Sequence, residues 1–165
     1  MTITATFRHR RILGAKKKIS DCRNKDCNDC YVRHRLFGVN LRAPMILAKL
    51  LLPAMIEKGE GVVINIGSVS GKTGEANGAA YSASKFGLIG FTQSLYEEVR
   101  EEGIKVSVIL PGFVDTPLIP PNRQLDRSKM IQADDIAQAV NYVLTSPATC
   151  CPVEITVRPQ RTPYR

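Results

Sequence analysis

Along most of the chain, apolar residues recur with the spacing of helices and strands in turn. Three segments carry apolar residues every three or four positions, which predicts helices with an apolar stripe: 36–58, 79–102 and 133–144. Three short, mostly β-branched runs predict strands buried on both faces: 61–66, 105–110 and 153–157. Strands and helices in alternation, joined by right-handed crossovers, predict an α/β fold with a parallel sheet.

The residues that break or cap helices refine this pattern. Pro44 and Pro53 lie inside the first predicted helix, so it allows kinks or a break. Gly103 ends the second predicted helix. Asp134 and Asp135 fall in the first turn of the third, where the helix dipole favours carboxylates.

Residues 1–35 have no sustained period and few apolar side chains, which predicts an irregular, poorly ordered segment. Charge changes at the same place. Residues 1–36 contain ten Lys/Arg and three Asp, whereas residues 37–165 contain thirteen Lys/Arg and twelve Asp/Glu. We therefore expect two parts, a basic, Cys-containing segment 1–35 and a nearly neutral α/β domain 36–165.

Composition excludes some classes of protein. Charged residues and glycines interrupt the apolar stretches before about 18 residues, so the sequence predicts no membrane span. No apolar run with a small-residue cleavage site follows the basic N-terminus, which argues against a secretory signal. With five cysteines and no export signal, we expect a reduced, cytoplasmic protein.

Side chains suited to acid–base chemistry gather around the second predicted helix. Tyr81 and Lys85 are four residues apart and share a helix face, where an ammonium would stabilise a phenolate and lower the tyrosine pKa. Ser68 and the pair Pro111 and Gly112 follow neighbouring predicted strands, at the edge where open α/β sheets place their sites. The sequence therefore predicts a proton-transfer site at this edge.

These motifs, in this order and spacing, resemble the short-chain dehydrogenases/reductases. The resemblance rests on the run 63–68 ending in Ser68, on Tyr81-x-x-x-Lys85, on the run 111–116 and on Asn40. It covers roughly residues 36–157 and is closest to the 3-oxoacyl-[acyl-carrier-protein] reductase branch. It implies the C-terminal part of a Rossmann-like, doubly wound parallel sheet, preceded by the irregular N-terminal segment.

The resemblance also implies a role for each residue. Tyr81 would exchange a proton with a carbonyl oxygen as hydride passes to or from a nicotinamide, and Ser68 would hold that oxygen. Lys85 would bind the nicotinamide ribose, and Asn40 would hold a water that relays protons to it. The residues implied at the nicotinamide end are Pro111, Gly112, Val114 and Thr116.

The implied cofactor is NAD(P), with NADP slightly favoured, and the implied activity is hydride transfer between it and a carbonyl or alcohol. The substrate would be a small molecule or carrier-bound, and Arg123, Arg127 and Lys129 could favour an acidic carrier or an anion. The family pairs the equivalents of helices 36–58 and 79–102 across subunits, which implies a homo-oligomer.

The first half of the family pattern is missing. Gly14 is the single glycine upstream of Gly38, so no Gly-rich turn can hold a pyrophosphate, and cofactor binding would be weakened. The strand 61–66 would lack a neighbour and present an apolar edge. A truncated or mis-started reading frame joined to a reductase tail would explain the charge step. The nucleotide sequence upstream would test this hypothesis.

Other functions remain open. The chain could be a catalytically silent family member that acts only by oligomerisation. A metal site could form from Cys22, Cys27, Cys30 and His34, although no fourth-ligand pattern is convincing. A nucleic-acid-binding module could use the basic residues of segment 1–35, which has little aromatic interleaving. They are Arg8, Arg10, Arg11, Lys16, Lys17 and Lys18.

The site residues also have ordinary structural interpretations. Ser68 could cap a turn, and Asn40 could be a plain polar helix residue. Lys85 could be a solvated lysine, and Pro111 with Gly112 could simply end a strand.

Overall fold

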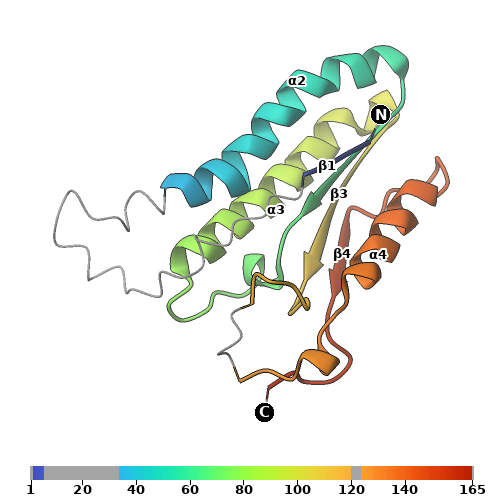
Figure 1. Cartoon of the computed structure of the whole chain (residues 1–165). Coiled ribbons are helices and arrows are strands. Elements are labelled where there is room, and N and C mark those ends of the chain that lie inside the picture. Colours follow the sequence, from blue (N-terminus) through green and yellow to red (C-terminus); the bar gives the residue numbers. More distant parts are fainter. Residues whose placement is uncertain (1, 6–33, 120–123, 165) are drawn as a thin grey trace.

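The computed structural model describes residues 2–5, 34–119 and 124–164, and these residues build a parallel sheet with helices on its faces (Figure 1). Four strands pair in parallel in the order β1-β2-β3-β4. Their bounds are β1 Thr2–Ala5, β2 Gly61–Ile66, β3 Ile104–Pro111 and β4 Glu154–Val157. The three strands predicted from apolar runs are all present, and their ends differ from the prediction by at most one residue.

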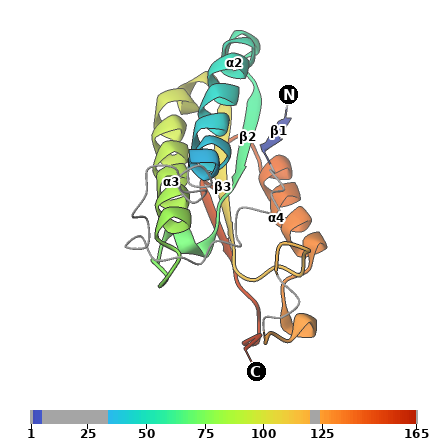
Figure 2. The ribbon, with the colours of Figure 1, turned by 60° about the vertical axis from the view of Figure 1, so that its left-hand side comes forward.

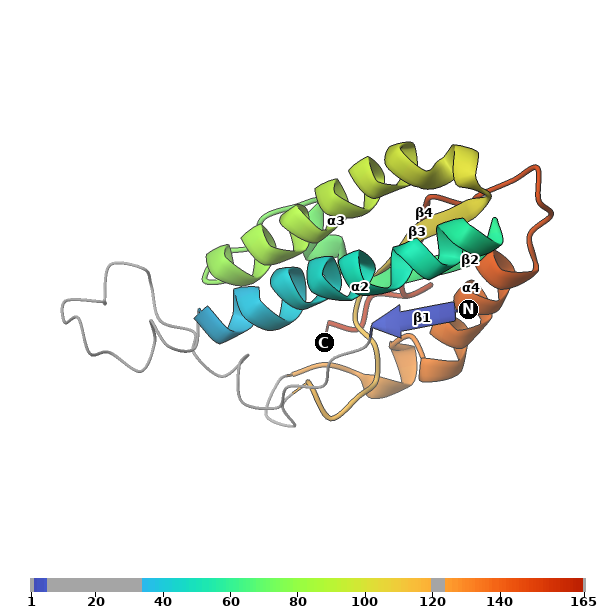
Figure 3. The ribbon, with the colours of Figure 1, turned by 90° about the horizontal axis from the view of Figure 1, so that it is seen from above.

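The helices lie on both faces of the sheet, as in a doubly wound fold. Helices α2 and α3 run side by side over one face, and α4 covers the other (Figures 2 and 3). Their bounds are α2 Ala43–Lys58, α3 Ala79–Val99 and α4 Ala133–Thr145. Short helical turns add η2 Gly38–Arg42, η3 Val69–Gly71, η4 Arg100–Glu102 and η5 Arg127–Lys129. The predicted fold class is confirmed.

Side chains of alternate sheet residues fill two cores. Val63 packs with Leu52 and Met55 of α2, in a cluster that also includes residues of α3. Ile64, the next residue of β2, packs instead with Val143 of α4. Because successive strand residues point to opposite faces, a β2 of apolar residues is buried on both sides.

The two prolines affect the helix His34–Lys58 differently. Pro53 lies within α2 without ending it. Pro44 follows the π-helical turn η2, in which the N–H of Ala43 bonds the carbonyl of Gly38, five residues earlier. Because Pro44 has no N–H, it cannot donate to the carbonyl of Asn40, four residues earlier. Pro44 thus removes the i+4 donor for the carbonyl of Asn40, a predicted site residue, and Met45 has the next backbone N–H along the helix.

The same helix is apolar enough to be considered as a membrane span. It has 25 residues, its most apolar window has a mean hydropathy of 1.5, and 17% of that window is buried. By length and composition alone it could cross a bilayer, although the interrupted apolar pattern predicts no span.

The prediction that β2 lacks a neighbour on one edge is wrong. Strand β1 lies there, with Thr2 opposite Val62 and Ala5 opposite Asn65. Thr2–Ala5 does alternate polar and apolar residues, but the low apolar content and high charge of residues 1–35 as a whole led to the prediction of an irregular segment, which missed β1. Residues 6–33 of segment 1–35 lie outside the described residues, and their predicted irregularity stays a prediction. His34 and Arg35, at the end of that segment, already belong to the helix His34–Lys58, so the predicted boundary is two residues too late.

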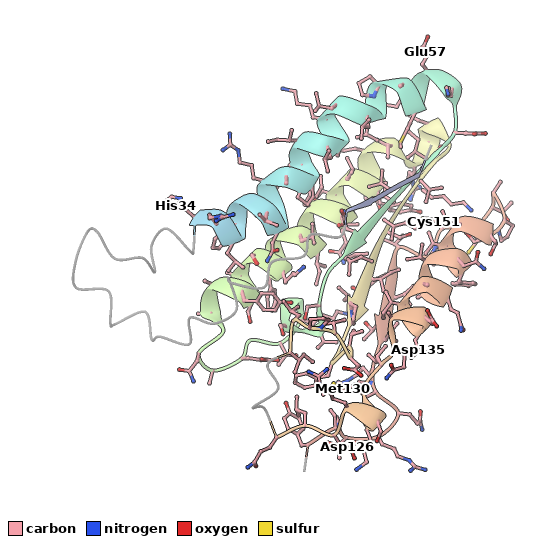
Figure 4. All side chains as sticks on the ribbon, viewed as in Figure 1. His34, Glu57, Asp126, Met130, Asp135 and Cys151 are labelled. Atoms are coloured by element: carbon pink, nitrogen blue, oxygen red, sulfur yellow. The ribbon has the colours of Figure 1, made fainter. Side chains whose placement is uncertain are left out.

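The C-terminal tail packs against the loop that follows β3. The N–H of Asp126 bonds the carbonyl of Pro163 at 2.8 Å, and the rings of Phe113 and Tyr164 meet edge to face, 5.5 Å between centroids. Figure 4 shows Asp126 and Met130 at this end of the molecule and Glu57 at the opposite end. The loops after β2 and β3 therefore share one end of the fold with the tail.

Candidate active site

The carboxyl ends of β2 and β3 bring the predicted motifs to one edge of the sheet. Ile66 lies opposite Ile109, and the N–H of Gly67 continues the pairing to the carbonyl of Ile109 at 2.7 Å. Gly112, just after β3, donates its N–H to Val157 of β4 at 2.8 Å. Parallel strands end at the same edge, so Ser68 and Gly112 both follow it.

Ser68 is buried and begins the short turn η3. Its backbone is extended, with φ −168°, and its Oγ accepts a hydrogen bond from the N–H of Ser70 at 3.1 Å. A hydroxyl that accepts from the backbone keeps its own hydrogen free to donate. Ser68 thus does cap a turn, and its hydroxyl hydrogen can be donated to the Tyr81 oxygen or to another oxygen in its place.

Tyr81 lies in the first turn of α3. Burial raises its pKa above the ordinary value, a hydrogen bond from Ser68 lowers it in part, and the charge of Glu75 raises it again. The net shift is upward, so Tyr81 is protonated at neutral pH and can act as a proton donor.

Lys85 follows one helical turn later and is held close to Tyr81. Its Nζ donates to the carbonyl of Ile66 at 3.0 Å and lies 5.9 Å from the centroid of the Tyr81 ring. Burial lowers the Lys85 pKa to about 8. The net shift of the Tyr81 pKa is upward because burial is its largest cause, so the lowering expected from Lys85 does not set the direction of the shift and stays a prediction.

Asn40 contacts α3 through Ser84. Its Nδ2 donates to Ser84 Oγ at 3.1 Å, and that hydroxyl donates to the backbone carbonyl of Tyr81 at 2.7 Å. Ser84 is fully buried. The turn that carries Asn40 is thereby fixed to the turn that carries Tyr81.

The residues predicted at the nicotinamide end lie after β3. Pro111 ends that strand, and Val114 forms a parallel bridge with Ile131. The carbonyl of Thr116 accepts a turn hydrogen bond from the N–H of Ile119 at 3.1 Å. These contacts fix the backbone beside the edge that carries Ser68.

The basic residues of the following loop are largely compensated by carboxylates. Arg127 pairs with Asp115 and donates to the carbonyl of Ile119 at 2.9 Å. Lys129 pairs with Asp126 at 3.2 Å. Arg123 lies outside the described residues. Two of the three cations predicted to favour an anionic substrate therefore already have acidic partners.

Sequence reasoning missed Glu75 and Ser70, although both lie close to the predicted site. Ser70 Oγ donates to Glu75 Oε1 at 3.2 Å, in the loop between Ser68 and Tyr81. A serine two residues after Ser68 and one carboxylate in a Gly-rich loop were the available signals. They carry no periodicity, so the pattern gave no reason to choose them.

The described residues show no group of three or more His, Cys, Asp or Glu arranged to hold a metal ion. Of the predicted metal ligands, Cys22, Cys27 and Cys30 lie outside those residues, as do the basic residues of the nucleic-acid alternative, from Arg8 to Lys18. Both alternatives therefore stay untested.

Comparison with known proteins identifies relatives. The profile of the family described as short chain dehydrogenase matches residues 15–126. An uncharacterized oxidoreductase of Staphylococcus aureus (strain MRSA252) is 40% identical over 124 residues, 75% of this chain and 53% of that protein. The chain thus spans about half the length of the curated relatives that it matches.

Solved structures of short-chain oxidoreductases are also similar to this chain. A metagenomic short-chain oxidoreductase in complex with NADP is 35% identical, with a TM-score of 0.64 over 80% of this chain and 53% of that one. A 3-ketoacyl-(acyl-carrier-protein) reductase from Brucella melitensis complexed with NADH is 26% identical, with a TM-score of 0.72 over 84% and 61%.

Proposed function

Because this chain belongs to the short-chain dehydrogenase family, we propose that it is a nicotinamide-dependent oxidoreductase acting on a carbonyl or alcohol, with Tyr81 as proton donor and acceptor. The proposal rests on one observation: Ser68, Tyr81 and Lys85 lie close together at the carboxyl end of β2. A protonated tyrosine beside a serine donor and a buried lysine suits proton transfer to a carbonyl oxygen.

The residues at this edge fit the nicotinamide end of the cofactor. Lysine has three N–H donors, and Lys85 uses one on Ile66, so two are left for the hydroxyls of a ribose. The bound nicotinamide would supply or accept the hydride. Ser68 would orient the carbonyl oxygen, and Tyr81 would give it a proton from its hydroxyl.

Asn40 would hold a water through its backbone carbonyl. Pro44 cannot bond that carbonyl, and the Asn40 side chain is occupied by Ser84. A water on a carbonyl without its usual helical partner could pass protons toward Lys85. The proposal places the relay on the backbone of Asn40 and gives its side chain a positioning role.

For the cofactor we propose NAD(P), with NADP slightly favoured. One similar structure is a complex with NADP and another a complex with NADH, so these neighbours leave the choice open. The described residues include no Gly-rich phosphate turn, and Gly14 cannot make one alone. We therefore expect weak cofactor binding, with Pro111, Gly112, Val114 and Thr116 lining the nicotinamide end.

The substrate is proposed to be a small-molecule or carrier-bound carbonyl compound, with 3-oxoacyl compounds as the first class to examine. The similarity to the 3-ketoacyl-(acyl-carrier-protein) reductase supports that starting point. The cytoplasm is the proposed location.

We also propose a homo-oligomer formed through α2 and α3. The outer faces of these helices expose large apolar side chains, and α2 packs its opposite face on the sheet. A second copy covering this surface would account for the hydropathy of His34–Lys58 without a membrane. The exposed apolar residues are Phe37, Met45, Ile46, Leu50, Ile56 and Phe86.

Replacing the Tyr81 hydroxyl tests the proposed function. With NADPH and a panel of 3-oxoacyl thioesters and small ketones, we expect oxidation of NADPH followed at 340 nm, and a loss of at least about a hundredfold in Tyr81→Phe. Equal rates in both proteins would contradict the role of Tyr81. No enhancement of NADPH fluorescence at high protein concentration, together with a folded circular-dichroism signal, would instead favour the alternative of a catalytically silent oligomer.

A further inference from the structure

Glu75 is linked to the proposed catalytic serine by two hydrogen bonds. Ser70 donates its side-chain hydroxyl to Glu75 Oε1 at 3.2 Å and its backbone N–H to Ser68 Oγ at 3.1 Å. Ser70 is buried, so it fixes the carboxylate relative to the turn that holds Ser68. The carboxylate of Glu75 is therefore held near the atoms that would bind the carbonyl oxygen.

A small polar region surrounds the same loop. A Cβ built on Gly78 would lie 3.5 Å from Glu75 Cβ and 3.8 Å from Ser82 Oγ, so both side chains flank this glycine. The Ser82 hydroxyl is buried and has no hydrogen-bond partner among the described residues. The Ser82 hydroxyl, close to Glu75, can therefore still form a hydrogen bond.

Glu75 has no salt bridge to a cation within the described ranges, whereas Lys72, Arg127 and Lys129 each have an acidic partner. Lys72, in the same loop, pairs with Glu154 at 2.5 Å. Arg127 and Lys129 pair with carboxylates after β3. The charge of Glu75 also raises the pKa of Tyr81. Glu75 therefore brings a negative charge close to Tyr81, alongside the buried amine of Lys85.

We propose that Glu75 is a specificity-determining residue that selects carbonyl substrates carrying a protonated amine close to the reacting carbon. An ammonium group would pair with the carboxylate while Ser68 holds the carbonyl oxygen. A neutral analogue would lose this charge-assisted hydrogen bond, and an anionic one would be repelled. The inference rests on the proposed function and narrows its substrate to small cationic ketones and the corresponding amino alcohols.

Three methyl ketones test the proposal because they differ only in the group next to the shared acetyl unit. Aminoacetone is cationic, butanone neutral and acetoacetate anionic at neutral pH. With NADPH and the full chain, we expect kcat/KM for aminoacetone to exceed that for butanone by about tenfold. Glu75→Gln should bring this ratio close to one, and Glu75→Lys should make acetoacetate the preferred ketone.

Glu57→Gln is the matched control, because Glu57 is exposed at the opposite end of the molecule (Figure 4). It should keep the wild-type ratio. The proposal is overturned if Glu75→Gln also keeps that ratio, or if the wild-type chain prefers acetoacetate to aminoacetone.

If no ketone is reduced, the proposed function fails for this chain, and binding tests Glu75 separately. Ligand-observed NMR compares 1-amino-2-propanol with 2-butanol in the presence of each protein. Stronger saturation transfer to the amino alcohol in the wild-type chain, lost in Glu75→Gln, supports the selection of cations. Equal transfer to both alcohols in the wild-type chain contradicts it.

Discussion

Burial affects the pKa values of Tyr81 and Lys85 more than the charges around them do. Tyr81 has a raised pKa and Lys85 a lowered one, and burial is the largest cause of both shifts. The sequence identified this pair by its four-residue spacing, but it could not give the direction of the tyrosine shift. That direction depends on how α3 packs against β2 and η3, which residue spacing does not show.

Lys85 should destabilise the folded chain at neutral pH. Its folded pKa of about 8 lies below its ordinary value, so the unfolded chain binds more protons between those two values. Stability should therefore rise as pH increases from about 8 to about 10.5, where the cost of burying the ammonium disappears. Lys85→Met should raise the free energy of unfolding at pH 7 by up to about 3 kcal/mol.

Urea unfolding at several pH values checks this prediction. The wild-type chain should gain stability between about pH 8 and 10.5 relative to Lys85→Met, so the two curves should converge. Parallel curves, or a less stable Lys85→Met chain at pH 7, would show that the Ile66 carbonyl compensates the buried charge.

At the scale of elements, periodicity predicted helices and strands well and their mutual contacts poorly. The apolar stripe of 79–102 matches α3 and η4, and the run 61–66 matches β2. Strand β1 was missed although its four residues alternate polar and apolar, because the charge and low apolar content of the surrounding segment dominated the prediction. The contact of Asn40 with Ser84 joins residues 44 positions apart, which no local pattern encodes.

Ser84 should contribute to stability by joining η2 to α3. Ser84→Ala removes its hydrogen bond to the Tyr81 carbonyl and leaves Asn40 Nδ2 without this acceptor. We expect a loss of about 1–2 kcal/mol in the free energy of unfolding, measured in urea. Ser94→Ala is the control, because Ser94 is exposed on the same helix and should change stability by less than about 0.5 kcal/mol. Equal losses of stability in the two variants would show that Ser84 does not stabilise the fold by joining η2 to α3.

At the scale of the molecule, the described residues combine the proposed proton-transfer edge with exposed apolar side chains on α2 and α3. The family match and the fold of the predicted domain 36–165 both agree with the motif order in the sequence. The chain spans about half the length of its curated relatives, so whole-protein activity is a proposal here. The sequence could not predict which face of α2 is exposed, because apolar residues form more than one stripe along this helix.

The apolar surface of α2 should mediate self-association. Leu50 is 68% exposed there, so Leu50→Glu should shift the chain toward monomers in analytical ultracentrifugation. Leu144→Glu changes an exposed leucine on α4, at the other face of the sheet, and should leave the association unchanged. If both variants associate as the wild-type chain does, α2 is not the interface.

Transfer of a label from cofactor to product is the decisive experiment for the proposed hydride transfer. NADPH carrying deuterium at both C4 positions is incubated with the full chain and a panel of small ketones, and the alcohols are analysed by mass spectrometry. We expect one deuterium on the carbinol carbon of at least one product with the wild-type chain, and none above background with Tyr81→Phe. Absence of label with the wild-type chain, or equal labelling by Tyr81→Phe, would contradict this proposal.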